Sequence, residues 1–343
     1  MSDKSAIEWT DATWNPIRGC SRVSEGCRNC YAERVAARFS GPGMPYEGLA
    51  VMRNGEPRWT GEVRLIEKHL HDPLRWKRPR RVFVNSMSDL FHEGLTDEDI
   101  DKVFAVMALA PQHTFQILTK RPVRMREYLS APDVEARWTA IIHTMRERPS
   151  WFGRLTRGWW PQRHVWLGIS AENQATADER IPHLLAAPAA VRFVSAEPLL
   201  GPIDLGDALG RISEAHEPNR HAPGLDWVIV GGESGPNARV LNVGWVRDIV
   251  RQCKTARVAC FVKQLGAHPQ EIANTVEMDP PEAGDIMGMM NRARTHPAPD
   301  GWTRVTIAAT GESRLLRDLR LQSNKGGDWS EWPDDLRVRE YPR

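Results

Sequence analysis

Residues 165–173 read Val-Trp-Leu-Gly-Ile-Ser-Ala-Glu-Asn, a short apolar run followed at once by polar side chains. A run of this length, bounded by polar residues, is typical of a strand that is buried on both faces of a sheet. The pattern recurs along the chain and predicts a series of such strands. The other runs are Val82–Val84, Phe115–Leu118, Val191–Val194, Trp227–Val230 and Ala259–Val262, and a first strand is expected near Ile7–Trp14.

Segments with helical spacing lie between most of these runs. Asp97–Ala110 and Val243–Cys253 each carry apolar residues at intervals of three and four. Strands that alternate with helices predict an α/β fold with a parallel sheet. We expect a partial or closed parallel (β/α) barrel, and a doubly wound sheet is the alternative.

The alternation stops near residue 265, which predicts where the barrel ends. We expect residues 1–265 to form the barrel, with insertions near residues 146–163 and 207–224. Residues 266–343 are then a C-terminal extension, and we expect Trp329, Trp332, Leu336 and Tyr341 to pack on the barrel.

Polar and ionisable side chains follow each predicted strand. In a parallel barrel the carboxyl ends of the strands meet at one rim, which is where active sites lie. The alternative is that these are ordinary loop residues and caps of the following helices. The residues concerned are Asn85, Ser86, Ser88, Asp89, Lys120, Ser170, Glu172, Asn173, Glu197, Glu233 and Lys263.

Three of the five cysteines fall close together, as Cys20, Cys27 and Cys30 in a Cys-x6-Cys-x2-Cys spacing. Three thiolates on one loop can hold three irons of a [4Fe–4S] cluster and leave the fourth iron open for a ligand. A structural zinc site with a fourth ligand from elsewhere is the alternative, because Cys-x2-Cys is also a zinc spacing. Cys253 and Cys260 fall on a predicted helix and a predicted strand, and we expect both to be buried packing residues.

Arginines and aromatic residues alternate in residues 146–163. This mixture suits phosphate contact combined with base stacking, and it predicts nucleic acid as a partner. The alternative is a surface loop whose tryptophans dock on the barrel. The residues concerned are Arg146, Arg148, Trp151, Arg154, Arg157, Trp159, Trp160 and Arg163.

The composition narrows the class of protein. The net charge is +2 over 343 residues, so any nucleic-acid contact must come from local patches. Five cysteines, clustered and odd in number, do not resemble a secreted disulfide framework. The first residues lack the apolar segment of a signal peptide, and no stretch is apolar enough to span a membrane. We therefore expect a cytoplasmic protein with no membrane partner.

Several of these segments occur together in one known family. The run WNPIRGCSRVSEGCRNCYAE (residues 14–33), with FVNSMSDLF (83–91), FVSAEPLLGPIDL (193–205) and WVIVGGESG (227–235), resembles the phage-associated three-Cys-motif protein family, over roughly residues 5–343. A Cys loop after a first strand, followed by parallel (β/α) repeats, also resembles the radical S-adenosylmethionine (SAM) superfamily. The first gap of the loop is six residues here, whereas that superfamily commonly has three.

The resemblance implies a radical SAM enzyme with a barrel of the radical SAM type. In such an enzyme Cys20, Cys27 and Cys30 would ligate a [4Fe–4S] cluster, SAM would bind the open iron, and an external one-electron donor would start formation of a 5′-deoxyadenosyl radical. From the Arg/Trp segment and the phage association, the expected substrate is a nucleic-acid base, and a peptide or a small metabolite is the alternative. The residues expected to bind cofactor are Asn85, Ser86, Ser88, Asp89, Lys120, Ser170, Glu172 and Asn173, and those expected to be catalytic are Glu197, Glu233 and Lys263.

Two other functions fit the same residues. One is a zinc-stabilised, non-enzymatic protein that binds nucleic acid through residues 146–163. The other is a hydrolase that uses the strand-end carboxylates and whose Cys loop is structural. Bound metal separates the first from the radical enzyme, and activity without a reductant identifies the second.

Overall fold

The computed structural model describes residues 5–145, 159–210, 224–235, 237–274, 303–306, 313–319, 321, 323 and 325–342. Seven parallel strands form its central sheet, in their order along the chain. They are β1 (Ala12–Trp14), β6 (Arg81–Val84), β7 (Thr114–Thr119), β8 (Val165–Ser170), β9 (Val191–Ala196), β10 (Trp227–Gly231) and β12 (Ala259–Gln264).

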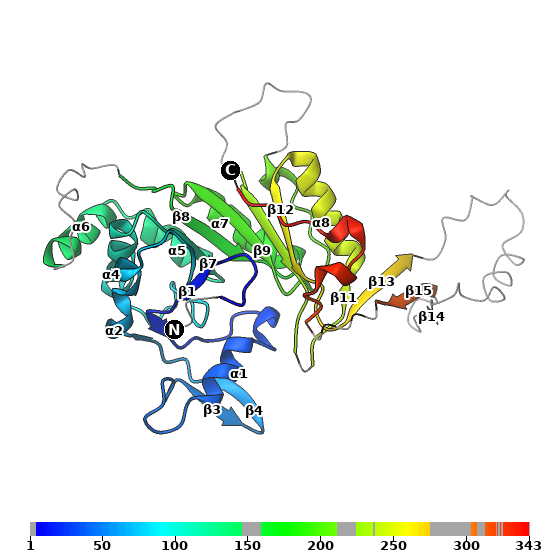
Figure 1. Ribbon diagram of the computed structural model, residues 1–343, viewed down its shortest axis with the longest axis horizontal. Helices are drawn as coiled ribbons and strands as arrows, with labels where there is room; N and C mark the ends of the chain where they lie inside the picture. Colours follow the sequence, from blue (N-terminus) through cyan, green and yellow to red (C-terminus); the bar gives the residue numbers. More distant parts are fainter. Residues whose placement is uncertain are drawn as a thin grey trace, which may run out of the picture.

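The sheet curls into a half-barrel (Figure 1). Each strand pairs in parallel with its predecessor in this order, so the strand order never reverses. A doubly wound sheet would reverse at a central switch point, so that alternative is wrong. Within the described ranges no pairing joins β1 to β12, and the barrel is partial. The prediction of a partial or closed parallel (β/α) barrel is therefore confirmed for the partial form.

Helices cover the convex face of the sheet, as the alternating sequence predicts. The expected helix over residues 97–110 is α4, and a capping box between Thr96 and Asp99 fixes its start. The expected helix over residues 243–253 is α8, which continues to Ala256. The helices are α4 (Asp97–Leu109), α5 (Pro122–Leu129), α6 (Val134–Thr144), α7 (Gln174–Ala186) and α8 (Val243–Ala256), with the short α2 (Glu67–Leu70) and α3 (Asp72–Arg75) before β6.

Aromatic side chains fill the concave face toward the N-terminal ends of the strands. Trp9 packs on Phe83 at 4.7 Å between ring centroids, and Phe193 packs on Trp227 at 5.6 Å. Gly168 makes room for this packing, because a Cβ there would lie 2.4 Å from the ring of Phe193. The N-terminal end of the half-barrel is therefore plugged, and open space remains at the carboxyl ends of the strands.

The remaining strands lie outside the half-barrel. A second sheet has the order β11-β13-β15-β14, and two small antiparallel pairs, β2-β5 and β3-β4, accompany the first strand and α1. Their bounds are β2 (Ile17–Arg18), β5 (Arg64–Leu65), β3 (Ala50–Arg53), β4 (Glu56–Trp59), α1 (Tyr31–Arg38), β11 (Leu241–Asn242), β13 (Pro269–Asn274), β14 (Thr303–Thr306) and β15 (Ser313–Asp318). In the described ranges no helix is both long and apolar enough to cross a bilayer.

The C-terminal tail lies along the outer edge of β12. Val262 N–H donates to the carbonyl of Val338 at 2.8 Å, and Glu340 N–H donates to the carbonyl of Cys260 at 2.8 Å. Tyr341 then packs on the ring of Trp227, 5.5 Å between centroids. The tail thus adds an antiparallel partner to the last strand of the half-barrel.

Both predicted insertions lie partly outside the described residues. Of the Arg/Trp segment, residues 146–158 are outside them. Trp159 and Trp160 are half-buried and pack on Trp138, at 5.6 and 5.1 Å between centroids, which is what the docking alternative predicts for these two. Arg163 is exposed. Leu209, in the second predicted insertion, is buried in the main core, and residues 211–223 are outside the described part.

The tail is expected to contribute strongly to stability. Trp332 is 2% exposed and belongs to the main core, whereas Trp329 is 44% exposed. Trp332→Ala should lower the free energy of unfolding by about 3–5 kcal/mol, because the cavity left by a buried tryptophan cannot collapse fully. Trp329→Ala should lower it far less. Thermal and denaturant unfolding of both variants checks this, and equal effects would contradict the packing of Trp332.

Candidate functional site

A cavity of about 700 Å³ opens at the carboxyl ends of the strands. Its lining includes all three clustered cysteines and every predicted strand-end residue except Glu172 and Asn173. The loop that carries the cysteines follows β2 and leads into α1, so it lies over the rim of the half-barrel. The lining residues predicted from sequence are Cys20, Cys27, Cys30, Asn85, Ser86, Ser88, Asp89, Lys120, Ser170, Glu197, Glu233 and Lys263.

The loop starts beside the end of β6. Gly19 bridges to Ser88 and has a φ of +94°, in the left-handed region. A Cβ on Gly19 would lie 2.0 Å from the carbonyl oxygen of Glu62, so only glycine fits this position. The Ser88 hydroxyl donates to the carbonyl of Ile17 at 3.0 Å and ties the same region together. Cys20 therefore enters the cavity from a fixed backbone.

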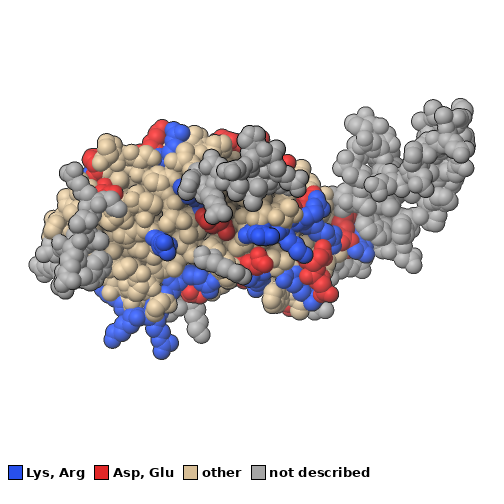
Figure 2. Space-filling view, turned by 90° about the horizontal axis from the view of Figure 1, so that it is seen from above, with Lys and Arg blue, Asp and Glu red and all other residues tan. Residues whose placement is uncertain are grey.

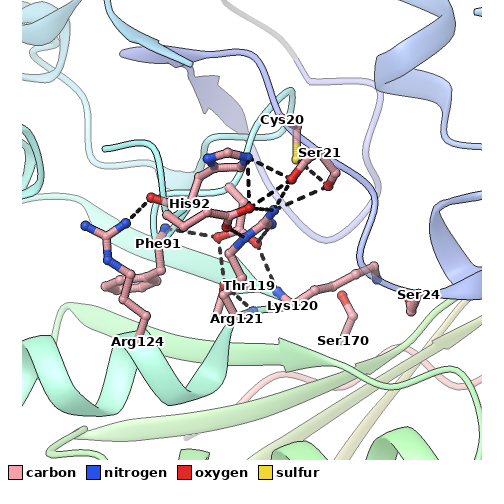
Figure 3. A network of polar contacts seen from close by, with 12 residues as sticks. Cys20, Ser21, Ser24, Phe91, His92, Thr119, Lys120, Arg121, Arg124 and Ser170 are labelled. Carbon is pink, nitrogen blue, oxygen red and sulfur yellow. Dashed lines mark hydrogen bonds and ion pairs between the residues drawn. The ribbon is translucent and has the colours of Figure 1, made fainter. Parts of the chain in front are cut away.

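Arg121 holds the first part of the Cys loop. Its guanidinium donates to the Ser21 hydroxyl at 2.6 Å and to Asp89 at 3.1 Å. Asp89 also accepts from the Thr119 hydroxyl at 2.7 Å, so its carboxylate is already engaged within the protein. Figure 3 shows His92 and Arg121 converging on Ser21, directly beside Cys20. Asp89 thus acts here as an anchor of the loop.

Glu172, just after the end of β8, bonds the middle of the Cys loop. It is buried and accepts from the Ser24 hydroxyl at 3.0 Å, and it pairs with Lys120 at 2.8 Å and with Arg180 at 3.3 Å. Burial opposes the ionisation of Glu172, but the two cations and the hydroxyl outweigh it and keep its pKa below the usual value. Gly26 sits against this carboxylate, since a Cβ there would lie 2.4 Å from Oε1 of Glu172.

Glu233 holds the last part of the loop. Its carboxylate accepts from the Asn29 side-chain amide at 2.9 Å and from the Arg239 guanidinium at 2.6 and 3.0 Å. Burial raises the pKa of Glu233, and the hydrogen bonds from Arg239 and Asn29 more than offset that effect and lower it. A carboxylate stabilised in its charged form is a poor proton acceptor. The contacts of Glu233 are those of a residue that positions the Cys loop.

The three cysteines line the same cavity. Burial raises the pKa of Cys20 to about 12, with further contributions from Asp89 and from the other two thiols. Burial also raises the pKa of Cys30, opposed in part by Lys120. Within the described ranges no three Cys, His, Asp or Glu side chains meet closely enough to hold one metal ion. The ligands of a cluster bind separate irons and do not meet at one point.

The residues present fit a cluster with a small polar ligand. The donor set is three thiols on one loop, and thiolates are the ligands that iron–sulfur clusters take. Asn85 lines the cavity, is 2% exposed, and its side-chain N–H₂ has no partner among the described residues. Because a buried amide without an acceptor costs free energy, this nitrogen suits an oxygen atom of a bound ligand.

A second polar group lies where β9 and β12 end. Lys263 Nζ donates to Glu197 Oε1 at 2.5 Å, and the Gln264 side-chain amide reaches the same oxygen at 3.3 Å. Both Glu197 and Lys263 line the cavity and are mostly buried. This pair differs from Glu172 and Glu233 in having no contact with the Cys loop among the described residues.

Asn173 does not belong to the cavity. Its side-chain oxygen accepts from Thr176 N–H and caps α7, which is the alternative that the sequence left open for strand-end residues. Ser86 and Ser170 line the cavity as expected, and the Ser86 hydroxyl donates to Asn15 at 3.2 Å.

Sequence reasoning missed several residues that shape the site. Arg121 follows Lys120 at a strand end, so the strand-end rule places it at the rim, but it received no role from the sequence. Asn29 lies between two of the cysteines, but its partner Glu233 is distant in sequence. Arg34 and Lys325 also line the cavity, and no motif marks either of them.

A family model described as "Protein of unknown function (DUF5131)" matches residues 4–313. The chain belongs to this family. No curated protein and no solved structure matches it. The matched residues include the Cys loop and all seven strands of the half-barrel, so the family model spans the whole candidate site except Lys325.

Proposed function

We propose that this protein is a radical SAM enzyme in which Cys20, Cys27 and Cys30 hold a [4Fe–4S] cluster. The observation that carries the proposal is the position of the Cys loop. Three thiols from one loop line a cavity at the carboxyl rim of a parallel half-barrel, together with the polar residues that end its strands. The rim of such a sheet is where catalytic groups gather.

The loop is built to keep its shape. Arg121, Glu172 and Glu233 each bond one of its side chains from a different strand end. A loop whose side chains are bonded to largely buried charged partners stays in place when a ligand binds or leaves. A cluster bound there would pass one electron to the sulfonium of SAM, and breaking of its S–C5′ bond would give methionine and a 5′-deoxyadenosyl radical.

The remaining rim residues would bind and orient ligands. Asn85 would donate its free N–H to an oxygen of SAM, and the hydroxyls of Ser86 and Ser170 lie in the same lining. Lys263, held by Glu197, would present an N–H donor to the substrate and pass a proton at Nζ. Glu233 is proposed as a positioning residue and no longer as a catalytic one.

The decisive experiment is anaerobic reconstitution with iron and sulfide, followed by addition of SAM and dithionite as the one-electron donor. We expect a brown protein that releases 5′-deoxyadenosine and methionine only when the reductant is present. A colourless protein that retains zinc and leaves SAM intact would contradict the proposal. Turnover of a substrate without reductant would favour the hydrolase.

A further inference from the structure

Two cations in the cavity lining lack a charged partner in the described part of the chain. They are Arg34 and Lys325. The other lining cations are neutralised, since Lys120 pairs with Glu172, Arg121 with Asp89 and Lys263 with Glu197. Glu8 is the one lining carboxylate without such a pair among the described residues, so the unpaired groups sum to one positive charge.

Both cations are positioned by close backbone contacts. Arg34 lies on α1, one turn after Cys30, and its guanidinium rests against Gly235, where a Cβ would lie 2.8 Å from Nη2. Lys325 precedes Gly326, whose carbonyl accepts from Leu265 N–H and from the Trp332 indole N–H, both at 2.9 Å. Two separate segments therefore bring a cation each to one cavity.

The floor of the cavity is apolar rather than charged. Its surface comes from Phe83, Leu118 and Trp9. Trp9 is 2% exposed, and its indole N–H has no acceptor among the described residues. An indole N–H is a donor only, and a buried one normally finds a partner. An acceptor on a flat ring bound against these side chains would satisfy it.

We propose that this cavity binds a phosphorylated nucleoside as substrate, with its phosphate on Arg34 and Lys325 and a carbonyl of its base toward Trp9. The inference rests on the proposed function in taking the cavity as the active site. A guanidinium binds phosphate through two parallel N–H donors and an ammonium adds a point charge, which together suit a dianion better than a single carboxylate. The phosphate comes from a free nucleotide or from a nucleic-acid strand.

The test is equilibrium binding to the full chain without cluster or SAM, with thymidine 5′-monophosphate and thymidine as probes. We expect the monophosphate to bind at least about tenfold more tightly than the nucleoside, as a charged hydrogen bond predicts. Arg34→Gln and Lys325→Gln should each weaken monophosphate binding by roughly five- to tenfold and leave thymidine unchanged. Lys254→Gln, an exposed cation outside the cavity, is the matched control.

A short oligothymidylate identifies the source of the phosphate. Tighter binding of the oligonucleotide than of the monophosphate, reduced by the same two substitutions, supports a strand, and equal binding supports a free nucleotide. Equal affinity for monophosphate and nucleoside, or no binding of either, overturns the inference. Lys325 is exposed, so its variant reports on binding even if Arg34→Gln folds poorly. Because this assay needs neither cluster nor SAM, its failure is separate from a failure to cleave SAM.

Discussion

Replacing Cys27 with alanine is expected to reduce bound iron after anaerobic reconstitution to background and to abolish reductive cleavage of SAM. The reason is that a cluster held by three thiolates of one loop loses a third of its protein ligands. Cys20→Ala and Cys30→Ala should behave in the same way. Iron and sulfide analysis with the visible absorption spectrum measures the loss, and circular dichroism shows whether the variants fold.

Cys253→Ala is the matched control for this prediction. Cys253 is fully buried on α8 and lies in the main core, away from the cavity lining. Its replacement should leave iron binding unchanged and lower only the unfolding temperature. Near-normal iron in Cys27→Ala would remove the basis of the cluster assignment, and iron loss in Cys253→Ala would show that the effect is not specific to the loop.

Gly26→Ala is expected to cause the second large effect. The added methyl group would lie 2.4 Å from Oε1 of Glu172 and 2.5 Å from its Cγ. That side chain cannot move aside easily, because it is buried between Lys120 and Arg180. The Cys loop must therefore shift away from the rim, at about 1–3 kcal/mol of strain. We expect reconstituted iron to fall several-fold while the secondary structure is retained.

Gly41→Ala separates loop displacement from a general effect of the substitution. At Gly41 the added Cβ would meet nothing closer than the sulfur of Met44 at 3.5 Å, an ordinary contact. This variant should bind iron like the unmodified protein. If both variants bind iron equally well, the contact between Gly26 and Glu172 does not set the position of the loop.

The half-barrel was predictable because each of its strands is nearly continuous in apolar residues. Runs such as Val165–Ile169 and Trp227–Val230 signal burial on both faces, and the structure has strands at both. The number of strands and their parallel order followed from the alternation with helices. Closure was not predictable, because it depends on whether β1 and β12 pair, and no local pattern records that pairing.

The lining of the site was also largely predictable, but the roles of its residues were not. The rule that polar residues after parallel strands share a rim placed Asn85, Ser170 and Lys263 correctly in one cavity. The same rule cannot distinguish a free carboxylate from one that is engaged. Glu233 meets Asn29 across most of the chain, and such pairs exist only once the fold has formed.

The pairing of the tail with β12 also bears on how the molecule avoids self-association. An open half-barrel has two edges, and the backbone of an uncovered edge strand is a template for pairing with another chain. The tail occupies the backbone groups of Cys260 and Val262, so this apolar edge is not available to a neighbour. Tyr341 extends the cover across to β6, where the Arg81 guanidinium lies over its ring at 4.1 Å from the centroid. The last residues of the chain thus protect one edge of the half-barrel against aggregation.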